Sequence, residues 1–141
     1  MTTNDRYNEL SFYTLAHKDK NFIHQHVVDT YAAQTADADT KPITIFFSLA
    51  GLYLFIEKNF SGRQVQEAHL QMSGKPKEYP AIILPESRGD ITVENVLAVS
   101  PGTERDKMIR KWAMSVWTAF SNQHAKVKYL TEKLLSNSRT D

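Results

Sequence analysis

An unusually apolar run near the middle of the chain sets the expected fold class. The run extends from Ile43 to Ile56, about fourteen residues, fewer than the roughly twenty that a membrane-spanning helix needs. Its β-branched and aromatic residues leave a strand possible, but its length and its lack of period-2 alternation favour a helix. A helix that is apolar on nearly all sides lies in a protein core. We therefore expect a central, buried helix from Ile43 to Lys58, opened by Pro42.

Most of the remaining chain shows helical periodicity. Further helices are predicted over residues 7–16, 20–34, 62–72, 93–99 and 103–135, with Ser61 and Thr92 as N-caps. The last of these carries an apolar stripe from Ile109 to Leu134, so we expect one unbroken helix roughly 45 Å long, whose protruding end would suit dimerisation. Residues 73–90 hold three prolines and read as a loop, either a lid or binding loop, or a packed extended connector. The prediction is a single-domain, all-α bundle of five to six helices covering residues 1–141, with one long proline-containing loop.

Composition excludes several classes of protein. A chain of 141 residues with 41% hydrophobic residues can fold as one domain without a disulfide or a structural metal. The absence of cysteine rules out a disulfide scaffold, a thiolate zinc site and cysteine catalysis. The net charge of +1 argues against nucleic acid or an anionic membrane as the main partner, although the last helix is locally basic. The first residues show no signal-peptide pattern, so we expect a soluble, cytoplasmic protein.

Five stretches of the sequence resemble a known family. They are Phe22–Gln34, Gly51–Glu57, Ser61–Leu70, Ile91–Leu97 and Trp112–Phe120, and they resemble a bacterial family of uncharacterised proteins, a domain of unknown function. The resemblance covers most of the chain and implies no activity. Some relatives begin with a cysteine-containing segment that this chain lacks, so no role of those cysteines is implied here.

A looser, architectural resemblance is to DinB-like helical bundles. Those cytoplasmic four-helix domains hold a metal with histidines from different helices. Their pair of histidines four apart in the last helix is absent here, where His124 stands alone.

Three histidines fall on the predicted inward faces of three helices: His24, His69 and His124. Converging imidazoles would make an open site for zinc, nickel or iron, with water in the remaining position. Asp29 or Glu67 would then orient that water or take its proton. The alternative is that each histidine is structural, hydrogen-bonded at the edge of the core.

Two further clusters are candidate binding sites. His26 and Asp29 lie three apart, on a face predicted to be outward, where they could form an acid–base pair or a plain surface pair. Tyr31 and Gln34 follow on the same helix as ligand-binding candidates. The second cluster is the helix opening at Ser61, where Arg63 and Gln64 could hold a small anion with the help of Lys75, Lys77 and Arg88, or form an ordinary capped turn.

Two functions from different classes follow. The first is a self-associating helical domain that binds a small ligand, with a homodimer expected and neither nucleic acid nor membrane as partner. The alternative is a metal-dependent hydrolase or transferase built on the three histidines. No dinucleotide fingerprint, phosphate-binding loop, nucleophile elbow or zincin pair is present, and whether the protein is an enzyme stays open from the sequence.

Overall fold

The computed structural model describes residues 2–74 and 78–138, and within them it contains α-helices and no strand. The all-α prediction is confirmed. Seven α-helices and one short 3-10 helix, η1, follow in chain order: α1 (Thr3–His17), α2 (His24–Thr35), α3 (Pro42–Ile56), α4 (Gly62–Met72), α5 (Val93–Ala98), α6 (Thr103–Ala119), η1 (Ser121–Gln123) and α7 (His124–Ser138).

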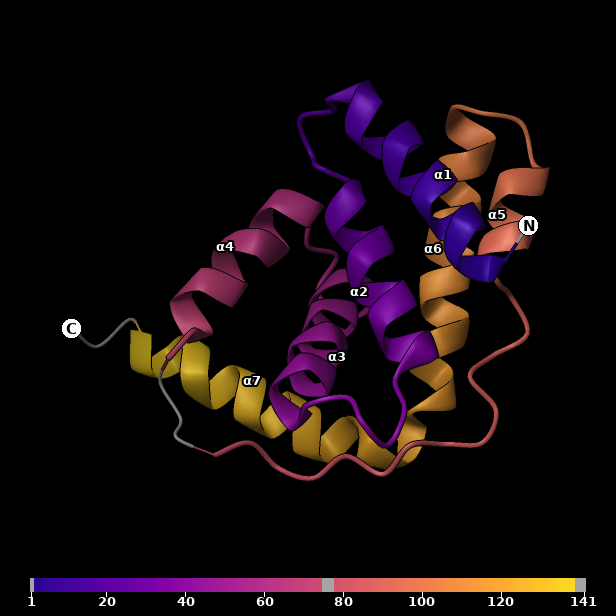
Figure 1. Ribbon diagram of the computed structural model, residues 1–141. Coiled ribbons are helices and arrows are strands. Elements are labelled where there is room, and N and C mark those ends of the chain that lie inside the picture. Colours follow the sequence, from indigo (N-terminus) through magenta and orange to yellow (C-terminus); the bar gives the residue numbers. More distant parts are fainter. Residues whose placement is uncertain (1, 75–77, 139–141) are drawn as a thin grey trace.

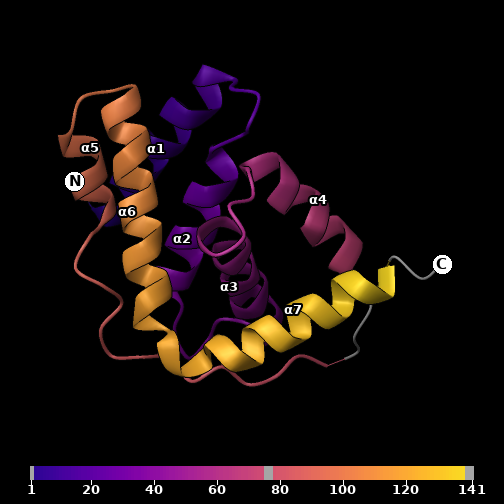
Figure 2. The same cartoon turned by 180° about the vertical axis from the view of Figure 1, so that it is seen from behind.

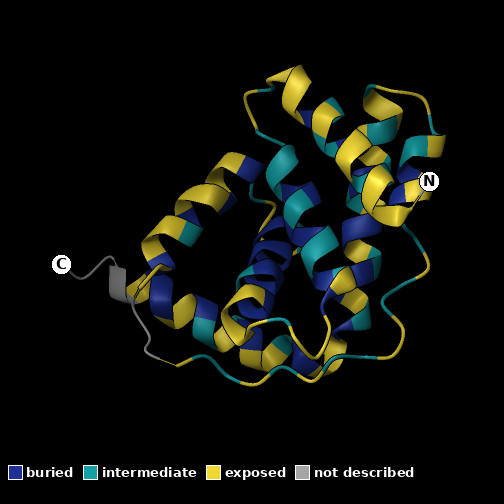
Figure 3. Ribbon diagram, in the orientation of Figure 1, coloured by how far each residue is buried: buried dark blue, intermediate teal, exposed yellow. Residues whose placement is uncertain are grey.

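Helix α3 is the centre of the fold, as its apolar sequence predicts. Every residue from Ile45 to Phe55 except Phe47 is buried. The helix contacts α2, α4, α6 and α7, which surround it in Figures 1 and 2, and the buried residues gather along it in Figure 3. Although α3 is strongly apolar, no helix in the described part of the chain is both long and apolar enough to cross a membrane.

The starts of α4 and α5 follow their predicted capping residues, whereas α1 begins at Thr3, four residues before its predicted start. Ser61 Oγ accepts a hydrogen bond from the Gln64 N–H (3.1 Å), and Gln64 Oε1 accepts one from the Ser61 N–H (2.8 Å). This capping box satisfies two of the donors that a helix N-terminus leaves free, and α4 begins at the predicted residue. At the start of α5, the Asn95 side chain accepts hydrogen bonds from the N–H (2.9 Å) and the hydroxyl (3.2 Å) of Thr92.

The prediction of one long final helix is wrong. Helix α6 ends at Ala119, the chain bends at Phe120, and α7 runs across one end of α3 towards α4 (Figures 1 and 2). The bend contains no proline or glycine, and its 3-10 turn keeps the apolar stripe nearly in phase, so periodicity alone does not reveal it. Helix α7 packs on α3 and α4 with Val127 and Leu134 buried. The stripe that suggested a protruding dimer face is therefore covered by the chain itself.

The proline-containing loop, in its described residues, is a packed connector. Tyr79, Ile82, Leu84 and Ile91 pack against the core. Arg88 anchors the segment to the end of α2 by donating to the carbonyls of Ala33 (3.0 Å) and Gln34 (3.1 Å). These contacts fix the loop along one side of the bundle and favour the connector over the lid.

Candidate ligand-binding pocket

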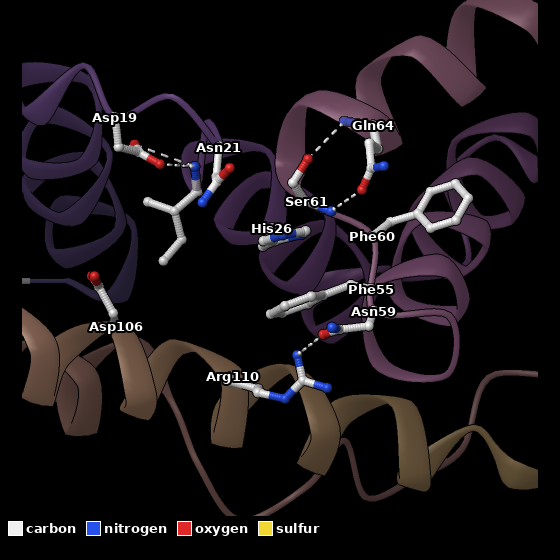
Figure 4. A pocket seen from close by; sticks show the side chains of 11 residues that line it. Asp19, Asn21, His26, Phe55, Asn59, Phe60, Ser61, Gln64, Asp106 and Arg110 are labelled. Carbon is white, nitrogen blue, oxygen red and sulfur yellow. Dashed lines mark hydrogen bonds between the residues drawn. The ribbon is translucent and has the colours of Figure 1, made fainter.

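A pocket of about 450 Å³ lies where the turn before α2, the end of α3, the start of α4 and one face of α6 meet. Figure 4 shows the side chains that line it. They are Asp19, Asn21, Ile23, His26, Phe55, Asn59, Phe60, Ser61, Gln64, Asp106 and Arg110. Polar groups predominate among them, so the pocket suits a polar molecule better than an apolar one.

His26 lies in the wall of this pocket. Its side chain is only 4% exposed, and its ring stacks on that of Phe55 with 3.5 Å between centroids and 8° between planes. Its Nδ1 atom is buried without a hydrogen-bond partner. Burial, assisted by the positive charge of Arg110, lowers the pKa of His26 from 6.5 to about 3. The imidazole is therefore neutral at neutral pH.

Phe55 lies between His26 and Arg110, which approach its ring from opposite sides in Figure 4. The Arg110 guanidinium carbon is 4.9 Å from the Phe55 ring centroid, within the range of a cation–π contact. One guanidinium nitrogen also donates to Asn59 Oδ1 at 3.4 Å. Arg110 takes part in none of the ion pairs among the described residues, so most of its hydrogen-bonding capacity is available.

Two carboxylates occupy the end of the pocket nearest α1. Asp19, in the turn after α1, accepts a hydrogen bond from the Ile23 N–H at 3.1 Å. Asp106, in the first turn of α6, comes from a distant part of the sequence (Figure 4). Burial and the negative charge of Asp19 raise the pKa of Asp106, while His17 partly offsets this. The two acids therefore lie close enough to repel each other.

The start of α4, which forms one wall of the pocket, is held by hydrogen bonds from Arg63 to backbone carbonyls of the turn before α2. The Arg63 N–H donates to the Asn21 carbonyl (2.9 Å), and Arg63 Nε donates to the Lys20 carbonyl (3.1 Å). A side chain at Gly62 would collide with the Phe22 carbonyl, so only glycine allows this close approach. The start of α4 is thereby held against the turn that carries Asn21.

One turn along α2 from His26, Asp29 is buried against α3. Gly51 makes room for it, because a Cβ atom at position 51 would overlap the Asp29 carboxyl group. Gln25 donates to one carboxyl oxygen at 3.2 Å, and the other, Oδ2, has no hydrogen-bond partner. Burial raises the pKa of Asp29 well above its usual value. The prediction that His26 and Asp29 lie on an outward face is therefore wrong, because both side chains are buried.

The three histidines predicted as metal ligands do not converge. His24 pairs through Nδ1 with Thr14 Oγ1 (2.9 Å), and His69 Nε2 donates to the Phe47 carbonyl (2.9 Å). His124 stacks on Trp117 and donates through Nε2 to that residue's carbonyl (2.7 Å). Within residues 2–74 and 78–138, no group of three or more acidic or histidine side chains is placed to hold a metal ion. Each of these imidazoles has a structural partner of its own.

Of the other predicted site residues, one lines the pocket and two make structural contacts outside it. Gln64 lines the pocket with His26. Gln34 supports the core, because its Oε1 accepts from the buried Trp112 Nε1 (2.9 Å) and its Nε2 donates to the Ile91 carbonyl (2.8 Å). Tyr31 stacks on Tyr7 at 3.9 Å.

Glu67 is exposed on α4 and does not line this pocket. The anion site predicted at the start of α4 is already filled, because Asn21 and Ser61 accept from the Arg63 and Gln64 N–H groups. Lys75 and Lys77, predicted to assist there, lie outside the described residues.

Asp19, Phe55, Asp106 and Arg110 were missed by the sequence reasoning. Phe55 lies in the apolar run of the central helix and Arg110 in the locally basic last helix, and neither pattern by itself indicates a binding site. The one available signal was the four-residue spacing of Asp106 and Arg110, which places both on one face of a helix.

Taken together, these features define an all-α domain with a polar pocket between its central helix and three surrounding elements. The chain belongs to a family of unknown function, DUF5946, whose family model matches residues 4–121. Comparison with curated proteins and with solved structures finds no match.

Proposed function

We propose that the protein binds a small polar molecule in the pocket beside His26. The observation that carries this proposal is His26 itself, a buried neutral imidazole in the pocket wall whose Nδ1 has no partner. A buried polar atom without a hydrogen bond costs about 1–3 kcal/mol. A phenylalanine ring at position 26 would make the same stack on Phe55 without that cost. Because His26 also lines the pocket, its imidazole can offer a ligand a polar ring edge that a phenyl ring cannot.

The size of the pocket supports a small ligand. At about 30 Å³ for each water molecule, 450 Å³ corresponds to roughly fifteen waters. The amides of Asn21, Asn59 and Gln64 surround this space, and they supply both donors and acceptors. A molecule of metabolite size can therefore displace water and exchange its hydrogen bonds for bonds to the protein.

The experiment compares the wild-type protein with H26F in a thermal-shift screen of polar metabolites, followed by calorimetric titration of every compound that stabilises the wild type. A ligand at one hundred times its Kd adds about 2.7 kcal/mol to the stability of the folded state. We expect such a compound to stabilise the wild type and to bind H26F at least tenfold more weakly.

The matched control is T118V, which changes an exposed residue beside a separate depression between α6 and the proline-containing loop. This variant should bind the ligand as the wild type does. The proposal fails if no compound stabilises the wild type, or if H26F binds the ligand as tightly as the wild type.

Self-association, predicted from the sequence, draws no support from the apolar stripe of α7, because α3 and α4 cover it. The homodimer stays a prediction. Light scattering at micromolar concentration tests it, and a strictly monomeric particle contradicts it.

A further inference from the structure

The charges of the pocket are separated along its length. Asp19 and Asp106 occupy one end, whereas Arg110 lies towards the other, beside Asn59 (Figure 4). Asp106 and Arg110 are four residues apart on α6, a spacing at which such residues often form an ion pair on a helix surface. They do not pair here, because the guanidinium group is turned onto the Phe55 ring.

None of these three charged groups has an ionic partner within the described residues. The ion pairs there join Arg6 to Glu9, Lys58 to Glu132 and Lys128 to Glu57. Asp19 and Asp106 make one end of the pocket negative, with His17 as the neighbouring base and, in the described part of the chain, no ion pair to either carboxylate. A guanidinium group with unused donors leaves positive charge available at the other.

We infer that the ligand is a small zwitterion, with an ammonium group bound by Asp19 and Asp106 and a carboxylate bound by Arg110. This inference rests on the proposed ligand-binding function and specifies its ligand class. The Arg110 guanidinium is turned away from Asp106, onto Phe55 and towards Asn59, so the length of the ligand that joins the two ends is what a series of chain lengths measures. The buried imidazole of His26 contacts the part of the ligand between them.

Asp106 is exposed, and Asp19 and Arg110 are half-buried, so the opposite charges at the two ends, and not burial, favour such a ligand over a simple ion. An ammonium group alone would compensate the two acids but leave the guanidinium without a partner, and a carboxylate alone would do the reverse. Since hydrogen bonds between charged groups are about twice as strong as neutral ones, a molecule that satisfies both ends has the advantage.

The test is calorimetric titration of the wild-type protein with ω-amino carboxylates of increasing length: glycine, β-alanine, γ-aminobutyrate and δ-aminovalerate. Butylamine and butyrate serve as singly charged controls matched to γ-aminobutyrate. We expect one chain length to bind best, at least tenfold more tightly than either singly charged control.

Four variants assign the two ends. D106N should weaken binding of the best zwitterion and of butylamine at least tenfold while leaving butyrate binding unchanged. R110Q should weaken binding of the best zwitterion and of butyrate at least tenfold while leaving butylamine binding unchanged. R110K, which keeps the charge, should retain most of the binding. Unchanged butylamine binding by R110Q shows that its loss of butyrate and zwitterion binding is not loss of folding. K111Q changes the neighbouring exposed lysine of α6 and should bind as the wild type does.

The possible outcomes separate this inference from the proposal on which it rests. If an uncharged or purely anionic compound binds in a manner that depends on His26, and no zwitterion does, the ligand class is wrong and the binding function stands. Zwitterion binding that neither D106N nor R110Q changes also overturns the inference. If no compound of the series or of the metabolite screen binds, both fail.

Discussion

Replacing His26 by phenylalanine tests the central feature of the pocket through stability as well as binding. At pH 7 the phenyl ring can keep the stack on Phe55, and the unpartnered Nδ1 disappears. We expect H26F to be as stable as the wild type at this pH, or more stable by about 1 kcal/mol. At acidic pH we expect a larger gap between the two proteins.

The size of that gap follows from the pKa of His26, which is about 3 in the folded protein against 6.5 for an ordinary histidine. Below pH 6.5 His26 is protonated in the unfolded chain but stays neutral in the folded protein until the pH approaches 3. The stability associated with neutral His26 is therefore complete above pH 6.5 and is lost as the pH falls towards 3. Between pH 7 and pH 4.5 the loss amounts to about 2.5 kcal/mol.

The assay is chemical unfolding of both proteins at half-unit steps from pH 7 to pH 4.5. The difference in free energy of unfolding, H26F minus wild type, should grow by about 2.5 kcal/mol over this range, or about 8 °C in Tm. The difference is the informative quantity, because Asp29 acts in the opposite direction. Its raised pKa contributes stability that is present below its ordinary value of 3.8 and is lost as the pH rises towards the raised value.

The control is V27A, which removes two methyl groups from the fully buried neighbouring residue. It should cost about 2 kcal/mol at every pH, since no proton is involved. A difference between H26F and wild type that stays constant from pH 7 to pH 4.5 would falsify the assignment of His26 as a buried neutral imidazole.

Three further substitutions, measured by urea unfolding, test packing and hydrogen-bond contacts around the pocket. G51A should destabilise the protein by about 2–4 kcal/mol despite the better helix propensity of alanine, and adding D29A should recover most of the loss; a neutral G51A contradicts the contact between Asp29 and Gly51. Q34L should cost about 1–3 kcal/mol because it leaves the buried Trp112 Nε1–H unpaired, and it should leave ligand affinity unchanged; lost binding without lost stability would return Gln34 to the ligand site. S61A should cost about 1 kcal/mol through the lost cap of α4 and S61T much less, and equal stability of all three proteins would argue against the capping box.

The elements of the fold that depend on local sequence were predictable. The apolar run at Ile43–Ile56 predicts the central helix because almost every face of it must avoid water. The start of α4 at Gly62 follows from the hydrogen bonds of Ser61 and Gln64, which are three residues apart. Such signals involve neighbouring residues, so the sequence alone carries them.

The face of α2 was predicted less well, for a reason visible in the packing. Four helices, α1, α3, α4 and α6, contact α2, so it has no single inward stripe. Val27 is buried, but His26 and Asp29 are buried as well, and a pattern that assigns polar residues to the outside places both wrongly. The space that admits Asp29 exists only because Gly51 on α3 lies opposite.

The sequence by itself determined that the chain is helical, that residues 43–56 form its centre, and where α4 and α5 begin, because propensity, capping and periodicity act over a few residues. The tertiary structure decided where α6 ends and α7 turns back over α3, and which polar side chains share a pocket. Asp19, His26, Phe55 and Arg110 come from four separate segments, so their proximity depends on how the helices pack. The same packing sends His24, His69 and His124 to three different neighbours.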